Sequence, residues 1–211
     1  VDYPVTATFY DLIPLLNPED YLHTNVAFAR HYESKLESLK RADGLLAISH
    51  FSGSEAAQHL KYPTEKIAVA PLGPLSRSCD HDHANRERDD SRLLALGLTP
   101  GFLLYVGGSD ARKNLSRLVE AWAALPGKLQ AEHPLVLAGS MPEQDMDSLS
   151  VIAKATSSHP ANLRFLGQIS DKALVDLYGA CSAFVFPSWH EGFGLPALEA
   201  MAAGAAVIAA N

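Results

Sequence analysis

The stretch that decides the fold is AFVFPSWHEGFGLPALEAMAAGAAVIA, residues Ala183–Ala209. It opens with the apolar run Ala183–Phe186, continues through a glycine-containing loop and closes with a second apolar run, Ala206–Ala209. The residues between them, Pro196–Ala203, are predicted to form a helix, because proline suits the first helical position. Apolar runs without alternation, joined by a helix, predict neighbouring parallel strands that are buried on both faces.

The same alternation of strand and helix extends toward the N-terminus from this unit. Each expected strand is apolar throughout, and the first helix has its apolar residues at helical spacing. The expected strands are Phe102–Val106, Leu135–Ala138 and Leu163–Leu166; the expected helices are one capped by Asn114 that carries Leu115, Leu118, Val119 and Trp122, then Glu143–Thr156, and one capped by Ser170.

A second set of elements precedes a polar middle. Strands are expected at Thr6–Tyr10, Gly44–Ile48 and Lys66–Ala70, helices at Phe28–Leu39 and Ser54–Leu60, and a turn at Asp11–Pro14. Residues 72–100 lack periodicity apart from a short helix expected over Arg86–Leu96. We therefore predict an α/β protein with two Rossmann-like, doubly wound parallel-sheet domains, 1–71 and 101–211, joined by a linker, 72–100. The sequence begins in a strand and stops just after an apolar run, so we expect both domains to be incomplete.

Composition excludes several classes of protein. The net charge is −7 without a clustered basic surface, which argues against nucleic-acid binding. The two cysteines, Cys79 and Cys181, form no disulfide or metal-site spacing and suit a reducing cytoplasm. The longest apolar stretch, Ala200–Ala210, is far shorter than the ~20 residues that span a bilayer. We expect a soluble cytoplasmic protein; a peripheral contact with the inner face of the plasma membrane, through parts outside this chain, stays open.

Ligands of open parallel sheets bind outside the carboxyl ends of the strands, which directs attention to the loops Gly107–Lys113, Gly139–Pro142 and Pro187–Leu195. In the last loop, glycines let the backbone approach a ligand, and the helix start offers N–H groups to an anion. Glu191 precedes that helix start and Glu199 follows it, about 12 Å apart if all eight residues were helical. That scale suits a nucleotide sugar, with one carboxylate on the sugar, the other on the ribose, and the diphosphate between them. The alternative is a glycine-rich turn with Glu199 as an ordinary surface residue.

The loop Gly107–Asn114 places two cations, Arg112 and Lys113, beside another helix start. A diphosphate gains negative charge as it leaves, so cations aimed at it stabilise the transition state more than the ground state. Hydrogen bonds to a charged group contribute roughly 1.5–3 kcal/mol, against about 0.3–1 kcal/mol for a helix dipole. The two cations should therefore matter more than the dipole. The alternative is a solvated Arg-Lys pair ahead of a helix.

Other signals point to no further site. Asp80-His81-Asp82-His83 and Asp145-x-Asp147 have metal-ligand residue types, but the first lies in the charged linker and the second at an expected helix start, so we predict no metal. Gly107-Gly108 lacks the glycine spacing of a dinucleotide fingerprint, so no nicotinamide cofactor is expected. His50 and Ser52 are interpreted as residues of a helix start.

Two long stretches closely resemble one known family. FLLYVGGSDARKNLSRLVEAW (102–122) and RFLGQISDKALVDLYGACSAFVFPSWHEGFGLPALEAMAAGAAVIAAN (164–211) are similar to retaining glycosyltransferases of the GT-B fold, specifically glycosyltransferase family 4, also called glycosyl transferases group 1. YDLIPLLNPEDY (10–21) and DGLLAISHFSGSEAA (43–57) resemble the later part of that family's N-terminal domain. The most specific feature is a pair of glutamates separated by seven residues, with FGLP between them.

The resemblance implies a role for each motif residue. Glu191 would contact sugar hydroxyls, Glu199 the ribose, and Arg112 and Lys113 the diphosphate. The implied catalytic residues are Glu191, Arg112 and Lys113; the implied donor-binding residues are Gly107, Gly108, Arg112, Lys113, Glu191, Gly192, Phe193, Gly194, Leu195 and Glu199. The family uses no metal, no cofactor and no established protein nucleophile. This chain departs from many members at Gly108, where they carry arginine, and at Tyr10, where they carry histidine.

The expected activity is transfer of a hexose, with retention, from a nucleoside-diphosphate sugar to a saccharide or lipid-linked acceptor. The motifs YDLIP and VGGSDARKN are most similar to bacterial mannosyltransferases that build surface polysaccharides, which implies mannose and GDP-mannose. Two alternatives stay open: a nucleotide-sugar epimerase of related fold, and a non-catalytic fragment that binds nucleotide sugars. The sequence does not fix the acceptor, the linkage or the oligomeric state.

Overall fold

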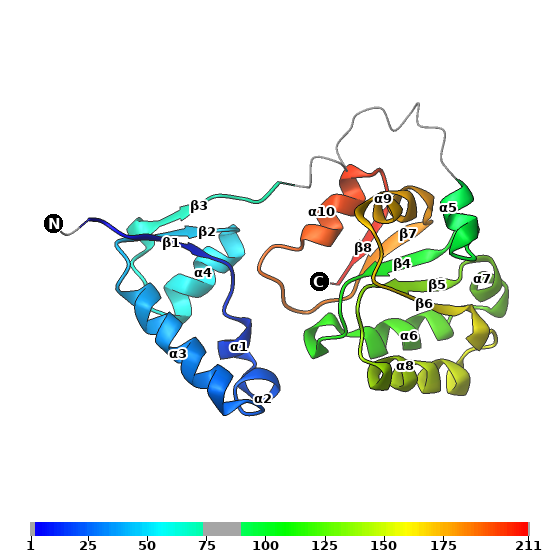
Figure 1. The fold of residues 1–211 in the computed structure, drawn as a ribbon, viewed down its shortest axis with the longest axis horizontal. Helices are drawn as coiled ribbons and strands as arrows, with labels where there is room; N and C mark the ends of the chain where they lie inside the picture. The colour runs from blue at the N-terminus through cyan, green and yellow to red at the C-terminus, as the bar shows by residue number, and fades with distance from the viewer. Residues whose placement is uncertain (1–2, 74–89, 211) are drawn as a thin grey trace. The chain divides into compact units, whose positions relative to one another are not determined.

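The computed structural model describes residues 3–73 and 90–210, and it divides the chain into two compact units (Figure 1). The first unit comprises Val1–Gly73 and His190–Gly194, and the second comprises Pro74–Trp189 and Leu195–Asn211. The sequence motif Asp80–His83 and the first residues of the helix expected at 86–96 lie outside the described residues.

The second unit contains a five-stranded parallel sheet with the order β6-β5-β4-β7-β8. All of its strands were predicted from apolar runs, and their ends agree within about one residue. They are β4 Leu103–Val106, β5 Leu135–Ala138, β6 Leu163–Gly167, β7 Ala183–Phe186 and β8 Val207–Ala209.

Helices cover both faces of this sheet, as a doubly wound fold requires; α9 and α10 lie above it and α6 and α8 below it in Figure 1. Successive residues of β4 point to opposite faces: Leu104 packs with α5, α9 and α10, and Tyr105 packs with α6 and α8. The helices of this unit are α5 Asp90–Ala95, α6 Leu115–Ala123, α7 Gly127–Glu132, α8 Glu143–Thr156, α9 Asp171–Ala180 and α10 Leu195–Ala202, with short 3-10 turns at η2 Ala111–Lys113 and η3 Pro160–Asn162.

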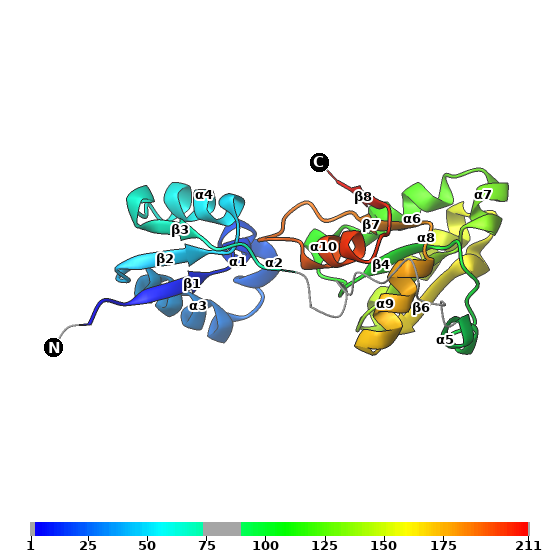
Figure 2. The same cartoon turned by 90° about the horizontal axis from the view of Figure 1, so that it is seen from above.

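The first unit contains a smaller parallel sheet in the order β1-β2-β3, with its helices on one side of the strands in Figure 1. Its elements are β1 Thr6–Phe9, α1 Ile13–Leu16, α2 Pro18–Tyr21, α3 Val26–Lys40, β2 Gly44–Ala47, α4 His50–His59, η1 Thr64–Lys66 and β3 Ile67–Val69. Figure 2 looks onto the strands, with α4 next to β3 and α3 next to β1. Phe9, Leu45 and Ala47 share the helix-covered face, while the side chain between the last two, Leu46, is 39% exposed. Among the described residues, helices cover this sheet on one face only, so the doubly wound arrangement expected for the first unit stays a prediction.

Several helices differ from the sequence expectation. The structure has α1, α2 and α7 where no helix was predicted, because four to six residues show too little periodicity. The helix α4 starts at His50 rather than Ser54, since Ser49 and Ser52 form a capping box. The helix α5 lies within the short helix expected over Arg86–Leu96, and its Leu93 is buried in the core of the second unit. None of the helices among the described residues combines the length and apolar character needed to cross a bilayer.

Candidate functional site

The order of the strands in the second unit marks a position for a ligand. From β4 the chain proceeds outward through β5 and β6 on one side, and through β7 and β8 on the other. The direction reverses between β4 and β7, and in open parallel sheets the ligand crevice lies at the carboxyl ends of the two strands that flank this reversal. The loop after β4 carries the two cations that the sequence singled out, and the loop after β7 carries Glu191 and leads into α10, which carries Glu199.

Two contacts fix the position of the loop after β4, one from a side chain of β4 itself and one from the end of β5. The hydroxyl of the fully buried Tyr105 donates a hydrogen bond to the carbonyl of Gly108, with a distance of 2.7 Å. Gly107 and Gly139, which follow the adjacent strands β4 and β5, have φ of +150° and +130°. A Cβ at Gly139 would lie 2.1 Å from the carbonyl oxygen of Gly107, so no larger residue fits between the two strand ends.

A further support comes from the start of α8, where Asp145 accepts a short hydrogen bond from the hydroxyl of Ser109. Asp145 belongs to one of the aspartate pairs that mimic a metal motif in the sequence, and in the structure its carboxylate holds the loop after β4. Among residues 3–73 and 90–210, no three His, Cys, Asp or Glu side chains gather closely enough to hold a metal ion.

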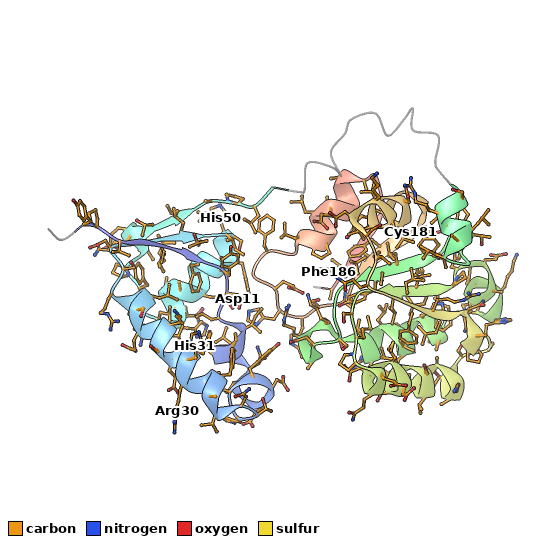
Figure 3. The ribbon with its side chains drawn as sticks, viewed as in Figure 1. Asp11, Arg30, His31, His50, Cys181 and Phe186 are labelled. Carbon is orange, nitrogen blue, oxygen red and sulfur yellow. The ribbon has the colours of Figure 1, made fainter. Side chains whose placement is uncertain are left out.

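Arg112 and Lys113 belong to the loop after β4 and lie near the end of β7. Asp110 caps η2 by accepting from the Arg112 amide at 3.3 Å, and its Oδ1 lies 3.4 Å from the Arg112 Nε. The Nζ of Lys113 lies 5.9 Å from the ring centroid of Phe186, the last residue of β7, which is labelled in Figure 3. A cation over a ring face is attracted by the ring quadrupole, which helps to hold Lys113 beside the strand reversal. Arg112 is mostly buried, with 19% of its side chain exposed.

The loops after β4 and β7 are also joined to each other. The Trp189 amide donates to the Arg112 carbonyl at 3.1 Å, and the Asn114 side-chain amide donates to the Pro187 carbonyl at 3.2 Å. Asn114 was predicted to cap α6 with its side chain. It occupies the capping position, but its backbone is left-handed, with φ of 56°, and its side chain bonds Pro187 instead.

Glu199 lies on α10 and is partly buried. Its Oε2 accepts a hydrogen bond of 3.3 Å from the hydroxyl of Tyr178, a residue of α9 that is 1% exposed. Burial raises the pKa of Glu199 above its ordinary value, and the charge of Asp171 adds to the rise, while the bond from Tyr178 opposes it. Burial and the neighbouring Glu199 likewise raise the pKa of Tyr178. Glu199 is therefore a carboxylate that further hydrogen-bond donors would stabilise in its charged form.

The predicted site residues fall into two groups. Gly107, Gly108, Arg112, Lys113, Leu195 and Glu199 belong to the second unit, whereas Glu191, Gly192, Phe193 and Gly194 belong to the first. In the latter segment Gly192 is buried, Gly194 has φ of +88°, and the side chain of Glu191 is partly buried. The separation of about 12 Å that the sequence suggested for Glu191 and Glu199 stays a prediction.

Sequence reasoning missed the residues that support the site. Tyr105, Asp145 and Tyr178 bond the loop after β4 or Glu199, yet each has the appearance of an ordinary strand or helix residue in the sequence. The one available signal is Tyr105, since a tyrosine in a fully buried strand needs a partner for its hydroxyl. Pro196 is the second residue of α10, one position later in the helix than predicted.

A parallel α/β sheet with cations and a half-buried carboxylate in the loops and helices around its strand reversal has the Rossmann-like architecture, a class of fold in which ligands bind at that edge. Comparison with known proteins then identifies the family. Residues 87–211 match the family described as "Glycosyl transferases group 1", and the chain belongs to that family.

Relatives cover the rest of the chain. It is 34% identical to the serotype-specific mannosyltransferase WbdA of Escherichia coli over the whole chain and 26% of that protein. It is also 34% identical to the O-antigen chain mannosyltransferase B of Escherichia coli, over 97% of the chain and 52% of that protein. The crystal structure of Anabaena Alr3699/HepE in complex with UDP and glucose superposes with a TM-score of 0.72 and 20% identity, over 98% of this chain and 52% of that one. The chain thus spans between a quarter and about half the length of the proteins it matches.

Proposed function

We propose that this chain carries the donor site of a retaining glycosyltransferase of the GT-B fold, with two Rossmann-like domains, 1–71 and 101–211, joined by the linker 72–100. The observation that carries the proposal is the position of Arg112 and Lys113 beside the strand reversal, in a loop bonded to the one after β7. Two relatives named as mannosyltransferases and a similar structure that holds UDP and glucose support a nucleotide sugar as donor. Mannose is the proposed hexose, GDP the proposed nucleotide, and a saccharide or lipid-linked molecule the proposed acceptor.

Arg112 and Lys113 are proposed to bind the diphosphate. Negative charge grows on the leaving diphosphate as the bond to the anomeric carbon breaks, so cations at that point lower the barrier. Asp110 and Phe186 hold the two cations before the donor arrives, which reduces the reorganisation needed during the reaction. Glu199 is proposed to accept hydrogen bonds from the ribose hydroxyls, which would stabilise its charged form against the cost of burial.

The proposed chemistry retains configuration. The acceptor oxygen bonds to the anomeric carbon on the face from which the diphosphate departs, and a phosphate oxygen takes the acceptor's proton. Glu191 contacts hydroxyls of the donor sugar, while the backbone of Phe193, Gly194 and Leu195 meets the sugar and the diphosphate. No step in this proposal calls for a metal ion or a protein nucleophile.

The test is a calorimetric titration of the chain with GDP, UDP, ADP and their common sugar conjugates, first without metal and then with magnesium. We expect one diphosphate and its conjugates to bind without metal, and Glu199→Ala to weaken that binding by roughly tenfold or more, since the bonds lost involve a charged acceptor. Glu120→Ala, which removes an exposed carboxylate from α6, is the matched control.

Unchanged affinity in Glu199→Ala would contradict the proposed ribose contact. The epimerase alternative has a separate readout in the products. An epimerase converts the nucleotide sugar alone, whereas a transferase needs an acceptor to form its sugar product.

A further inference from the structure

The segment His190–Gly194 leaves the second unit in sequence but packs with the first. It follows β7 and leads into α10, both elements of the second unit, yet its contacts place it with Val1–Gly73. The segment includes Glu191, the residue proposed to contact the donor sugar. The side chains that hold this segment belong to α4 and to its N-cap, Ser49, and the backbone of the turn after β1 passes close to it.

The first anchor is a contact between the His190 imidazole and the Glu55 carboxylate. The imidazole Nε2 lies 2.8 Å from Oε1 of Glu55, with 12% and 8% of the two side chains exposed. The Phe51 ring stands edge-on to the imidazole, with ring centroids 5.8 Å apart. Burial is the largest influence on Glu55 and raises its pKa; the nearby charge of Asp11 acts in the same direction, and His190 opposes it.

Burial of the Glu55 carboxylate within α4 is energetically unfavourable. It lies inside α4 among buried residues, and its second oxygen, Oε2, has no hydrogen-bond partner within the described part of the chain. Burying a carboxylate with one partner is costly, and a well-packed apolar pair would often serve stability as well or better. The contact with His190 therefore gives little net stability, but it fixes the position and orientation of the His190 side chain.

The second anchor is at Gly192, on the other side of Glu191. The Ser49 hydroxyl donates to the Gly192 carbonyl at 2.6 Å, while the same oxygen accepts from the Ser52 amide to cap α4. A Cβ at Gly192 would lie 2.6 Å from the Tyr10 carbonyl oxygen, so the backbone passes against the turn after β1. The turn's Asp11 is labelled in Figure 3.

We propose that Ser49 and Glu55 are positioning residues for recognition of the donor sugar: they hold Gly192 and His190, and thereby fix the backbone of Glu191 between them. This inference rests on the proposed function. Sequence reasoning assigned the whole donor site to the C-terminal domain, whereas these two residues come from the N-terminal part of the chain. They act on the sugar through Glu191 and leave the diphosphate contacts of Arg112 and Lys113 untouched.

The test compares binding of a diphosphate with binding of its sugar conjugate. GDP and GDP-mannose are titrated into wild type, Ser49→Ala, Glu55→Gln and the conservative variant Ser49→Thr; if the titration above identifies another diphosphate, that pair is used. We expect Ser49→Ala and Glu55→Gln to weaken GDP-mannose binding by roughly tenfold through misplacement of Glu191, with GDP affinity unchanged. Ser49→Thr keeps the hydroxyl and should restore the affinity for the conjugate.

The matched controls are Ser54→Ala, whose hydroxyl bonds only the carbonyl of His50 within α4, and Glu65→Gln on the exposed η1 turn. Both should retain wild-type affinity for both ligands. Equal loss of GDP and GDP-mannose affinity in Ser49→Ala or Glu55→Gln would overturn positioning in favour of general destabilisation, and unchanged affinities would overturn it outright. A wild-type chain that binds neither any diphosphate nor any conjugate would overturn the proposed function itself, which is a different result.

Discussion

The two sheets of this protein differ in how many of their faces are covered by helices. In the second unit, Leu104 and Tyr105 are neighbours in β4 and both are fully buried, because helices cover both faces. In the first unit, Leu45 and Leu46 are neighbours in β2, but the former is 1% exposed and the latter 39%. One sheet is the centre of a three-layer sandwich, and the other has a single layer of helices against it.

This difference shows how strand sequences record their surroundings. All four residues of β5, Leu135–Ala138, are apolar and buried, as parallel strands covered on both faces require. The sequence of β1, Thr6–Phe9, alternates threonine with apolar residues, and only Phe9 is fully buried. Alternation in a parallel strand is thus a sign of one covered face, which the sequence interpretation of this chain overlooked.

The largest expected change in stability distinguishes two neighbouring residues of β2, Leu45 and Leu46. Leu45→Ala should cost about 2–5 kcal/mol of unfolding free energy, because it leaves a cavity under α3 and α4. Leu46→Ala should cost about 1 kcal/mol or less, because its side chain already meets solvent. Urea denaturation followed by circular dichroism measures both. Similar losses in the two variants would mean that the outer face of this sheet is covered in solution.

The next largest change in stability is expected from alanine substitutions at two glycines near the strand ends of the second unit. Gly139 and Gly167 both have positive φ where β5 and β6 end, so alanine is strained at either position. A Cβ at Gly139 also collides with the Gly107 carbonyl, whereas a Cβ at Gly167 has no atom within 4 Å. Gly139→Ala should therefore cost about 1–3 kcal/mol more than Gly167→Ala, as overpacking typically does.

The measurement is again the free energy of unfolding, with diphosphate affinity as a second readout. Because Gly107 begins the loop that carries Arg112 and Lys113, Gly139→Ala should also weaken diphosphate binding more than Gly167→Ala does. Equal losses of unfolding free energy in the two variants would show that the ends of β4 and β5 are not in close contact at Gly107 and Gly139.

The smallest effect concerns Glu199, the partly buried carboxylate of α10. Burial raises its pKa in the folded protein above the ordinary value. The folded state then holds the proton more tightly than the unfolded chain, so this stabilisation is complete below the ordinary pKa and is lost as pH rises through the raised pKa. Glu199→Gln does not titrate, so its unfolding free energy relative to wild type should rise as the pH increases from the ordinary carboxyl pKa, about 4, through the raised pKa of Glu199.

The control for this titration is Tyr178→Phe. It removes the hydrogen bond that opposes the rise in the pKa of Glu199, so it should move the pH dependence to higher pH. A pH-independent difference between Glu199→Gln and wild type would contradict the burial that the structure gives to Glu199. Gain of stability together with loss of ribose binding would indicate that Glu199 serves ligand binding at the expense of the fold.

Much of the second unit could be predicted because its local signals agree. The strand Leu135–Ala138 and the helix Glu143–Thr156 have the predicted ends, and Ser170 caps α9 by accepting from the Ala173 amide. The cations at Arg112 and Lys113 were also found from the sequence, since strand-to-helix loops of a parallel sheet meet at one edge. Their roles in donor binding stay predictions.

The parts that could not be predicted depend on contacts between distant residues. Asn114 has the residue type of a helix cap, but a bond to Pro187, far along the chain, draws its side chain away. Glu55 resembles any polar residue of a short helix, and only the packed structure shows it buried against His190. Spacing rules describe neighbours in sequence, and they carry no information on which remote loop will arrive beside a given side chain.

The bonds between the loops after β4 and β7 have a consequence for engineering. The Trp189 amide donates to the Arg112 carbonyl, and the Asn114 side chain donates to the Pro187 carbonyl, so the two loops keep a common geometry. A chimaera that takes only the loop after β7 from a homologue would place that homologue's residues against the unchanged loop after β4. The geometry of both hydrogen bonds between the loops would then be disturbed. Residues 107–114 and 187–189 should therefore be exchanged together, as a single cassette, in any attempt to graft a new specificity.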